Sequence, residues 1–529
     1  MTNNVMLFGV AAITTGIALT GAAFAQGQTP QKGGTAVFSI SQDPTTVNPD
    51  VSTNVPDRYI GCIAYQGLVQ LTPDYKVLPL LAKSWTISPD GLTYTFNLVD
   101  TEWHDGKPLV AEDVKYTLTE VSPKYSSIFA PAGAVIGSIE TPTKSQVVIK
   151  LKESFGPFMI SLGCIQGAAI MPSHLFQGTN PLQNPATTTA PVGTGAFKMT
   201  EWKRGDYVKM GRNAKYHEAG KPYLDEVIAK IIPQQASKMQ ALAAGELDVV
   251  QQIAPNDQAA VRANPKLKVV EDDIAPAMSL LFYNVKKKPF DDKRVRHALM
   301  MATDRDYLLK NVFFDLGTVG IAPFTTQIPW VANPSIDYRK MYPFDVAKAN
   351  AMLDEAGLKR GADGKRLSAK ITTFATQYPE LAQTAVALKS MWQQVGIDLT
   401  IEALEDATIL KQVYQDMNYD VTLTSYTSYS DPALGVVRIY NNAMIGKSFG
   451  NPSGYTNAKV EELFDQGKRS ITNEDRGKAY KEAQVILAED LPAIVLRQYR
   501  PVDAASARLN DLWGKVQGTG LWTDAWLSK

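Results

Sequence analysis

The chain contains one pattern of a catalytic nucleophile, and its surroundings do not suit catalysis. Gly446-Lys-Ser-Phe-Gly450 fits the Gly-x-Ser-x-Gly pattern of serine hydrolases. That pattern needs a strand before it and a helix after it, so that a sharp turn exposes the serine. Here Asn441 and Asn442 precede it and Asn451-Pro-Ser-Gly454 follows, a composition typical of a loop. A secreted hydrolase using Ser448 stays an alternative that the sequence disfavours.

Metal and cofactor chemistry also find little support. The four histidines are scattered, with no pair spaced at i, i+4 and no Cys-x-x-Cys beside them, so we expect no protein-bound metal. A metal carried inside a chelating ligand stays open. Gly193-Thr-Gly195 lacks the third glycine of a dinucleotide fingerprint. We therefore predict neither a cofactor nor enzymatic activity.

The two cysteines, Cys62 and Cys164, pair only if the chain reaches an oxidising compartment. The N-terminus predicts such export. Val5 to Thr20 is apolar, Ala23-Phe-Ala25 matches a small-x-small cleavage signal, and residues 1–25 read as a signal peptide of a periplasmic protein. An uncleaved membrane anchor is the alternative. Whether the cysteines form a disulfide or remain two buried thiols stays open.

Composition bounds the partners. The chain has 529 residues, 45% of them hydrophobic, with 53 basic and 53 acidic side chains, so its net charge is zero. Binding to nucleic acid rests on many cations that neutralise phosphates. A neutral chain of ordinary globular composition is expected to bind no nucleic acid, and the length allows about two to four domains.

Strand patterns alternate with helix patterns along the chain, which predicts an α/β fold. Pro89-Asp-Gly91 marks a hairpin turn, and Gly245 and Gly357 close helices. The strands expected are 35–40, two within 85–98, 146–151, 208–216, 227–232, 280–285, 371–376, 396–402, 421–425 and 493–496. Helices are expected over 57–71, 111–121, 236–244, near 295–302, 346–356, before 395, near 460–464 and over 479–489.

Short blocks then recur in a fixed order over nearly all of the chain after residue 25. They are Pro79–Trp85, Ser88–Phe96, Trp103–Pro108, Ala111–Val114, Pro191–Gly195, Arg212-Asn213 with Tyr216, Ala244–Asp248, Arg294–Leu299 with Asp304-Arg305, Ala356-Gly357, Trp392 with Gly396, and Asp431-Pro432. Through these blocks the chain resembles the family 5 extracellular solute-binding proteins, the dipeptide, oligopeptide and nickel receptors of ABC importers.

The resemblance implies a two-lobed α/β clamp of the periplasmic-binding-protein type, with an extra subdomain inserted in lobe one. Lobe one maps to residues 26–281 and 490–529, the inserted subdomain to about 58–186, and lobe two to 282–489. It also implies a monomer that binds a small molecule and meets the membrane subunits of an ABC importer. A clamp of this kind excludes water around its ligand and performs no reaction.

Peptide-binding relatives hold the ligand ammonium with an Asp three residues before the acid-Pro pair, a position occupied here by Ser428. Dipeptide receptors hold the carboxylate with an Arg 17 residues before the tryptophan of the Trp-x-x-x-Gly block, which is Ala375 here. A charge buried without a partner costs several kcal/mol. The sequence therefore favours an opine, an oligosaccharide or a derivatised small molecule over a free dipeptide; a dipeptide or oligopeptide receptor is the alternative.

The candidate ligand-binding residues fall in segments that face the cleft in relatives. Asp431 and Trp522 have strong structural alternatives, as a turn cap and as a core residue. The candidates are Asp43, Thr45, Val47 and Asn48 after the first strand, Gln377, Tyr378 and Glu405, the run Ser425, Tyr426, Thr427, Ser428 and Tyr429, and also Arg438 and Trp522.

Overall fold

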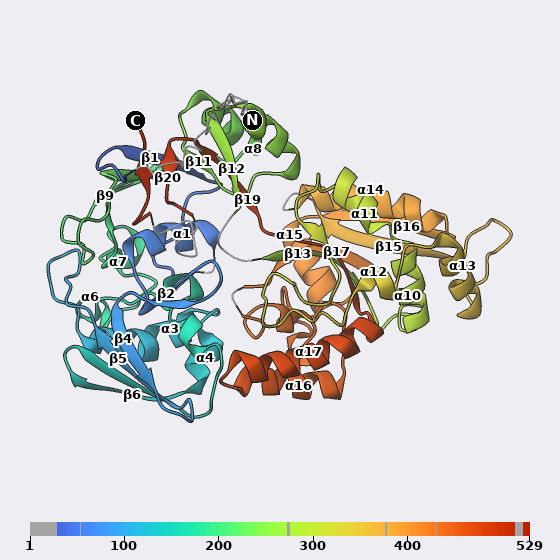
Figure 1. The fold of residues 1–529 in the computed structure, drawn as a ribbon, viewed down its shortest axis with the longest axis horizontal. Coiled ribbons are helices and arrows are strands. Elements are labelled where there is room, and N and C mark those ends of the chain that lie inside the picture. The colour runs from blue at the N-terminus through green and yellow to red at the C-terminus, as the bar shows by residue number, and fades with distance from the viewer. Residues whose placement is uncertain (1–28, 53, 272–275, 376–377, 430, 514–521) are drawn as a thin grey trace, which may run out of the picture.

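The computed structural model describes residues 29–52, 54–271, 276–375, 378–429, 431–513 and 522–529. The signal peptide expected over residues 1–25 and the candidate Gln377 lie outside these residues. The chain forms two α/β bodies side by side (Figure 1). No helix in the described part combines the length and the apolar character that a bilayer span needs.

The first body contains a seven-stranded mixed sheet in the order β12-β19-β11-β1-β10-β9-β8. β1 pairs in parallel with β10 and β11, while β9 and β19 run antiparallel to their neighbours. Its strands are β1 (Thr35–Ile40), β8 (Phe197–Lys203), β9 (Tyr207–Arg212), β10 (Glu226–Ile231), β11 (Val249–Val250), β12 (Leu267–Glu271) and β19 (Val502–Ser506).

A separate four-stranded antiparallel sheet, β4-β5-β7-β6, lies at the far end of this body (Figure 1). Its strands are β4 (Ala82–Ile87), β5 (Thr93–Leu98), β6 (Ile136–Thr143) and β7 (Gln146–Leu151). The hairpin of β4 and β5 confirms the prediction from Pro89-Asp-Gly91, because Gly91 adopts φ +69°, which a turn needs. The short ladders are β2 (Val69–Leu71) with β3 (Val77–Pro79), and β20 (Leu509–Asn510) with β21 (Trp526–Leu527).

The helices of the first body are mostly short. α1 ends at Ala64, and β2 follows where the sequence predicted a helix through residue 71. They are α1 (Val55–Ala64), α2 (Ala111–Tyr116), the π-helix η1 (Thr117–Val121), α3 (Ser122–Tyr125), α4 (Ala130–Val135), α5 (Phe158–Ser161), the 3₁₀ turn η2 (Cys164–Gln166), α6 (Ser173–Phe176), α7 (Pro185–Thr188), α8 (Gln235–Ala244), the 3₁₀ turn η3 (Pro255–Asp257) and α9 (Gln258–Ala263).

The second body has a six-stranded sheet in the order β14-β18-β13-β17-β15-β16. β13 is buried along its whole length between β17 and β18, which explains its continuous apolar sequence. The strands are β13 (Ala277–Tyr283), β14 (Thr318–Val319), β15 (Leu367–Phe374), β16 (Ile397–Leu404), β17 (Val421–Thr427) and β18 (Ala493–Tyr499).

Helices cover this sheet and form most of the largest core (Figure 1). α13 ends before Gly357, whose φ of +85° suits a residue that closes a helix. They are α10 (Lys293–Met301), α11 (Arg305–Asn311), α12 (Tyr338–Met341), α13 (Val346–Glu355), α14 (Pro379–Gln393), α15 (Asp406–Ile409), the π-helix η4 (Leu410–Gln415), the 3₁₀ turns η5 (Val436–Ile439) and η6 (Asn442–Met444), α16 (Ala458–Arg469) and α17 (Asn473–Asp490).

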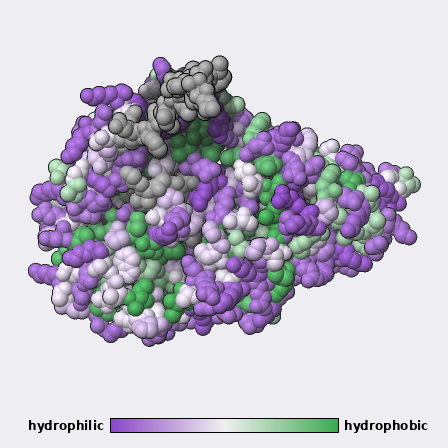
Figure 2. Space-filling view, viewed as in Figure 1, coloured by the Kyte–Doolittle hydropathy of each residue, from purple (hydrophilic) through white to green (hydrophobic). Residues whose placement is uncertain are grey.

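Chain crossings and side-chain contacts join the two bodies within the described residues. The chain crosses between them after β12 and again between β18 and β19. At a second contact, which we call the clasp, residues 153–156 touch the end of α16. Gly156 N–H donates to the Lys468 carbonyl at 2.8 Å, Ser154 Oγ donates to the Arg469 carbonyl at 2.6 Å, and Glu153 pairs with Arg469 at 3.3 Å. The face shown in Figure 2 is largely hydrophilic, with hydrophobic patches between the hydrophilic residues.

Candidate functional site

A cavity of about 340 Å³ lies between the two bodies, beside the crossing strands. Four of its lining side chains are tyrosines, and among the described lining residues one is a cation and none is an acid. The lining consists of Val55, Arg58, Tyr59, Ile165, Gln166, Gln252, Ala277, Tyr378, Ser425, Thr427, Tyr429, Tyr499 and Pro501.

The wall contributed by the first body, which we call wall one, is built from α1 and η2. Pro56 at the second helical position suits the start of α1, because its fixed φ fits the first turn. Cys62 and Cys164 form a disulfide between α1 and η2, which answers the question that the sequence left open. Arg58 Nη2 donates to the Ile165 carbonyl, so the two elements are joined again next to the cavity.

The wall contributed by the second body, wall two, is the end of β17 with the residues that follow it. Ser425 and Thr427 project to the same side of the strand, because side chains alternate along it. The Ser425 hydroxyl lies 3.0 Å from the Tyr499 hydroxyl. The Arg497 guanidinium lies over the Tyr499 ring, 3.9 Å from the centre of that ring.

Tyr429 extends wall two beyond the strand. It adopts a left-handed φ of 49°, an uncommon conformation for a bulky residue that is often kept where a site needs it. The Arg438 guanidinium lies 5.1 Å from the Tyr429 ring and 5.3 Å from the Tyr426 ring, and its Nε has no partner. Arg438 supports the wall from behind and does not line the cavity.

The four candidates after β1 have other contacts. Asp43 accepts from the Trp202 indole at 2.9 Å and from the Gly205 amide at 3.0 Å. Thr45 donates its hydroxyl to Asp57 at 2.6 Å. Val47 is buried in the core of the first body, and Asn48 is buried with its side chain against Met171 and Thr187. None of these four lines the cavity described here.

Of the other candidates, Tyr378, Ser425, Thr427 and Tyr429 do line it. Burial raises the pKa of Tyr378, so its phenol is neutral and serves as a hydrogen-bond donor. Glu405 is exposed just before α15 and lies outside the lining.

The remaining candidates lie behind the walls. Tyr426 is buried, with its hydroxyl 2.9 Å from that of Tyr414. Ser428 is fully buried, and its Oγ has no hydrogen-bond partner. Trp522 is buried in the core of the first body against Phe38, as the structural alternative expected.

Asp431 is structural in this fold. Its carboxylate receives two hydrogen bonds of 2.7 Å from Arg476, and a third of 2.9 Å from the Ala433 amide. Both side chains of this ion pair are buried. Asp431 therefore caps its own turn, as expected, and a partner inside the fold occupies its charge.

Within the described residues, the positions of Ser448 and of the metal-ligating side chains give no support to the hydrolase and metal alternatives. Ser448 is exposed in a loop, with neither a strand before it nor a helix directly after it. No group of three or more metal-ligating side chains occurs within the described residues. Burial lowers the pKa of His104 to about 4, and its Nε2 lies 3.0 Å from the Gly195 carbonyl, a structural arrangement.

The chain is similar in sequence and structure to known proteins. Residues 76–445 match the sequence profile of the bacterial extracellular solute-binding proteins, family 5. The chain belongs to this family. It is therefore a substrate-binding component of an ABC importer, and the family consists of binding proteins rather than enzymes.

Individual relatives agree. The oligopeptide-binding protein AppA of Bacillus subtilis is 29% identical over 478 residues, which is 88% of this chain and 86% of AppA. The glutathione-binding protein GsiB of Salmonella typhi is 28% identical over 493 residues, 90% of this chain and 91% of GsiB. The structure of AppA with a nonapeptide superimposes with a TM-score of 0.77 at 27% identity, over 95% of this chain and 100% of that chain. The family fold, a two-lobed clamp, is thus confirmed.

Sequence reasoning missed most of wall one and the crossing strands. Arg58 and Tyr59 fall in the helix expected over 57–71, and Ile165 and Gln166 fall outside every expected element; none of the four was a candidate ligand-binding residue. Tyr499 ends β18, whose apolar sequence indicated only a buried strand. One signal was present: the two cysteines stood next to this wall, and their pairing brings residues 58 and 165 together.

Proposed function

We propose that this binding protein captures one small polar solute without a free α-ammonium group in the cavity between its lobes. An oligosaccharide, a derivatised small molecule, or an opine whose nitrogen is acylated or closed into a lactam has this character. The observation that carries the proposal is the lining: four tyrosines, two hydroxyl side chains and two glutamines, without an acid among the described lining residues.

A free peptide presents an ammonium group that must find a negative partner once water is excluded. At the two positions that carry the terminal charges of dipeptides in relatives, this chain has Ser428 and Ala375, which are uncharged. The nearby Asp431 is neutralised by Arg476. Tyrosine rings and hydroxyls instead suit sugars and modified amino acids, which combine apolar faces with hydrogen-bonding edges.

The cavity volume supports a small ligand. About 340 Å³ is near the lower end of the roughly 300–1,000 Å³ of ligand pockets. The alternative, a dipeptide or oligopeptide, is favoured by the names of the relatives AppA and GsiB. A dipeptide is small enough to be a fair competitor, while a long peptide would need the lobes further apart.

The lobe limits proposed here follow the sheets. The boundary expected between residues 281 and 282 falls inside β13, which pairs along its whole length within the second sheet. Lobe two therefore begins before Ala277 and ends with β18, and lobe one comprises the rest, with β4 to β7 in its inserted subdomain. A monomer in the periplasm, exported by residues 1–25, completes the proposal.

A thermal-shift panel tests the ligand class. The protein is first freed of retained solute by unfolding and refolding without reductant. A ligand at about 100 times its dissociation constant adds roughly 2.7 kcal/mol to the free energy of unfolding. Stabilisation by opines, sugars or N-acylated compounds is the expected result, and stronger stabilisation by the free dipeptide Ala-Leu than by N-acetyl-Ala-Leu would refute the proposal.

A further inference from the structure

Arg58 is the one cation among the described residues of the cavity lining, and its guanidinium is incompletely bonded. Nη2 donates to the Ile165 carbonyl, while Nε is buried and has no hydrogen-bond partner. Within the described part of the chain, no Asp or Glu forms an ion pair with it. Burial lowers the pKa of Arg58, and the groups that act against this are the phenols of Tyr429 and Tyr59.

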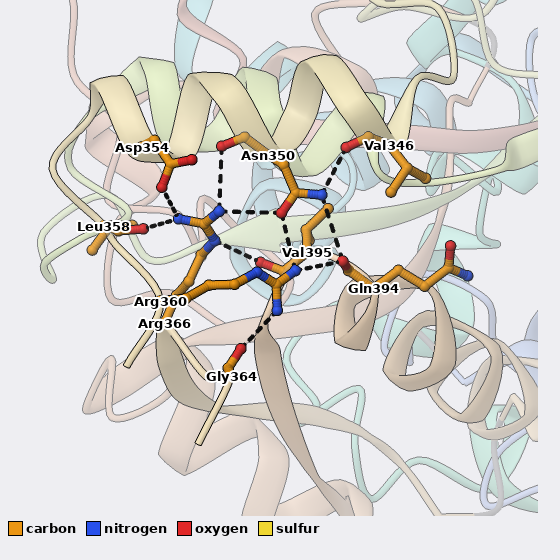
Figure 3. Close-up of polar contacts among 9 residues, drawn as sticks. All are labelled: Val346, Asn350, Asp354, Leu358, Arg360, Gly364, Arg366, Gln394 and Val395. Atoms are coloured by element: carbon orange, nitrogen blue, oxygen red, sulfur yellow. Dashed lines mark hydrogen bonds and ion pairs between the residues drawn. The ribbon is translucent and has the colours of Figure 1, made fainter. Parts of the chain in front are cut away.

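Arg366 is an arginine whose guanidinium nitrogens are all bonded within the fold (Figure 3). Arg366 Nε donates to the Val395 carbonyl at 3.0 Å, and Nη2 donates to Asn350 Oδ1 at 3.1 Å. Nη1 donates to Asp354 and to the Leu358 carbonyl. All three nitrogens are bonded, and a carboxylate balances the charge. Arg58 has neither.

The acid next to Arg58 in the sequence, Asp57, is already engaged. Asp57 accepts from the Thr45 amide and hydroxyl and from the Ser52 hydroxyl at 2.7 Å. Arg58 and Tyr59 also lie in the first turns of α1, whose N-terminal end carries the positive part of the helix dipole. The wall-one side of the cavity is therefore positive and has an unfilled donor.

We propose that Arg58 binds a carboxylate, or an equivalent anionic group, of the ligand, so that the solute captured between the lobes is an acid. This inference rests on the proposed function and narrows it, favouring opines, acidic sugars and N-acylated amino acids over neutral oligosaccharides. Tyr429 closes over the same side from wall two, so lobe closure completes the environment of the pair.

The Arg58 guanidinium lacks a counter-ion, and the carboxylate of a ligand needs a cation once water is excluded. A partly buried guanidinium without a counter-ion is costly, and a ligand carboxylate supplies that counter-ion. Hydrogen bonds between charged partners are about twice as strong as those between neutral ones. Removing Arg58 should therefore weaken the binding of an acid about 100-fold, while the ligand-free protein keeps or gains stability.

The experiment uses refolded wild-type protein, Arg58→Gln and Arg58→Lys. Arg294→Gln serves as the matched control, because Arg294 is exposed in α10 and pairs with Asp292 away from the cavity. The probes are paired acids and neutral counterparts: N-acetyl-Ala-Leu with its carboxamide, and trigalacturonate with maltotriose. Thermal shift selects the probes that bind, and calorimetric titration gives their affinities.

The expected result is that the acid of a pair stabilises the wild type and its neutral counterpart does not. Arg58→Gln should lose about 100-fold in affinity for that acid, Arg58→Lys should recover part of it, and Arg294→Gln should match the wild type. Stabilisation by maltotriose with none by the acids would overturn the inference and leave the proposed function standing. Undiminished affinity of Arg58→Gln for an acid, with an unchanged melting temperature of the free variant, would also overturn it.

Discussion

The two walls of the cavity are built in different ways. In wall one, a helix and a 3₁₀ turn are joined by the Cys62–Cys164 disulfide and by a buried polar network beneath them. Wall two is the end of a strand and an unusual turn, held by cation–π contacts and hydroxyl pairs. The difference suggests that wall one is a fixed platform for the ligand, while wall two arrives on it when the lobes close. Loss of the contacts that hold wall one together should thus cost stability first, whereas loss of the side chains that face the ligand, Arg58 in wall one and Tyr429 in wall two, should cost affinity.

The largest effect is expected when the disulfide is removed by Cys62→Ser with Cys164→Ser. The bond closes a loop with a sequence separation of 102 residues, and a loop of this size is worth up to about 4–5 kcal/mol in the free energy of unfolding. Urea denaturation of the variant, and of wild type with and without reductant, measures the loss. A loss below about 1 kcal/mol would mean that wall one is fixed by other contacts.

The next effect concerns pH. Asp50 supports wall one from below: its carboxyl accepts from the Ala169 amide at 2.8 Å and is bonded to Ser122. Burial raises its pKa to about 7 from 3.8, so the folded state holds a proton that the unfolded state releases. The contribution of Asp50 to stability is therefore complete at low pH and is lost as the pH rises through about 7.

Asp50→Asn removes this dependence, because the amide keeps a neutral group of the same shape. Between pH 5 and pH 7, the free energy of unfolding of the wild type should fall by roughly 2 kcal/mol relative to that of the variant. Thermal melts over this range give the difference. Parallel pH profiles for the two proteins would show that the Asp50 carboxyl is not protonated in the fold.

A substitution in wall two should lower the affinity for the ligand more than the free energy of unfolding. Tyr429→Ala removes a ring from the cavity and the surface on which Arg438 lies, so binding of the acid selected above should weaken about tenfold, or about 1.4 kcal/mol. The free energy of unfolding should change by less than that. Tyr307→Ala, at an exposed position in α11, is the control that should alter neither quantity.

The smallest effect is expected at the clasp. Arg469→Ala removes an exposed ion pair with Glu153 and leaves the backbone hydrogen bond of Gly156 in place. Exposed pairs contribute about 0–1 kcal/mol. The affinity for ligand should change less than threefold, and a loss as large as that of Tyr429→Ala would make the clasp, rather than wall two, the decisive closing contact.

The sequence predicted local elements and part of wall two, but it did not predict wall one. Alternating and helical periodicities located β1, β7, the β4–β5 hairpin, α8 and α13 nearly to the residue, because their patterns are local. Wall two was partly predicted, since hydroxyl and aromatic residues cluster at the end of a strand there. Tyr426 and Ser428 were predicted to bind ligand because their neighbours in the sequence were. Strand alternation buries Tyr426 and the turn buries Ser428, and neither lines the cavity.

Wall one escaped prediction because its function depends on tertiary packing. Nothing in the sequence distinguishes Arg58, which lies in the helix predicted over 57–71, from an arginine exposed to solvent. Its importance emerges only in the fold, where it lies beside the Ile165 carbonyl, lines the cavity and forms no ion pair with a described acid. For the loop after β1 the prediction erred in the opposite direction. Asp43 and Thr45 were predicted to bind ligand, but Asp43 accepts a hydrogen bond from the β8–β9 hairpin and Thr45 donates one to Asp57 at the start of α1.

Native mass spectrometry of the protein, purified without refolding, tests the central account most directly. The account predicts one small solute per chain, released on denaturation and detected as an acid without a free α-amino group, and absent from Arg58→Gln prepared in the same way. Recovery of a free dipeptide or longer peptide from the wild type, bound equally by Arg58→Gln, would contradict it.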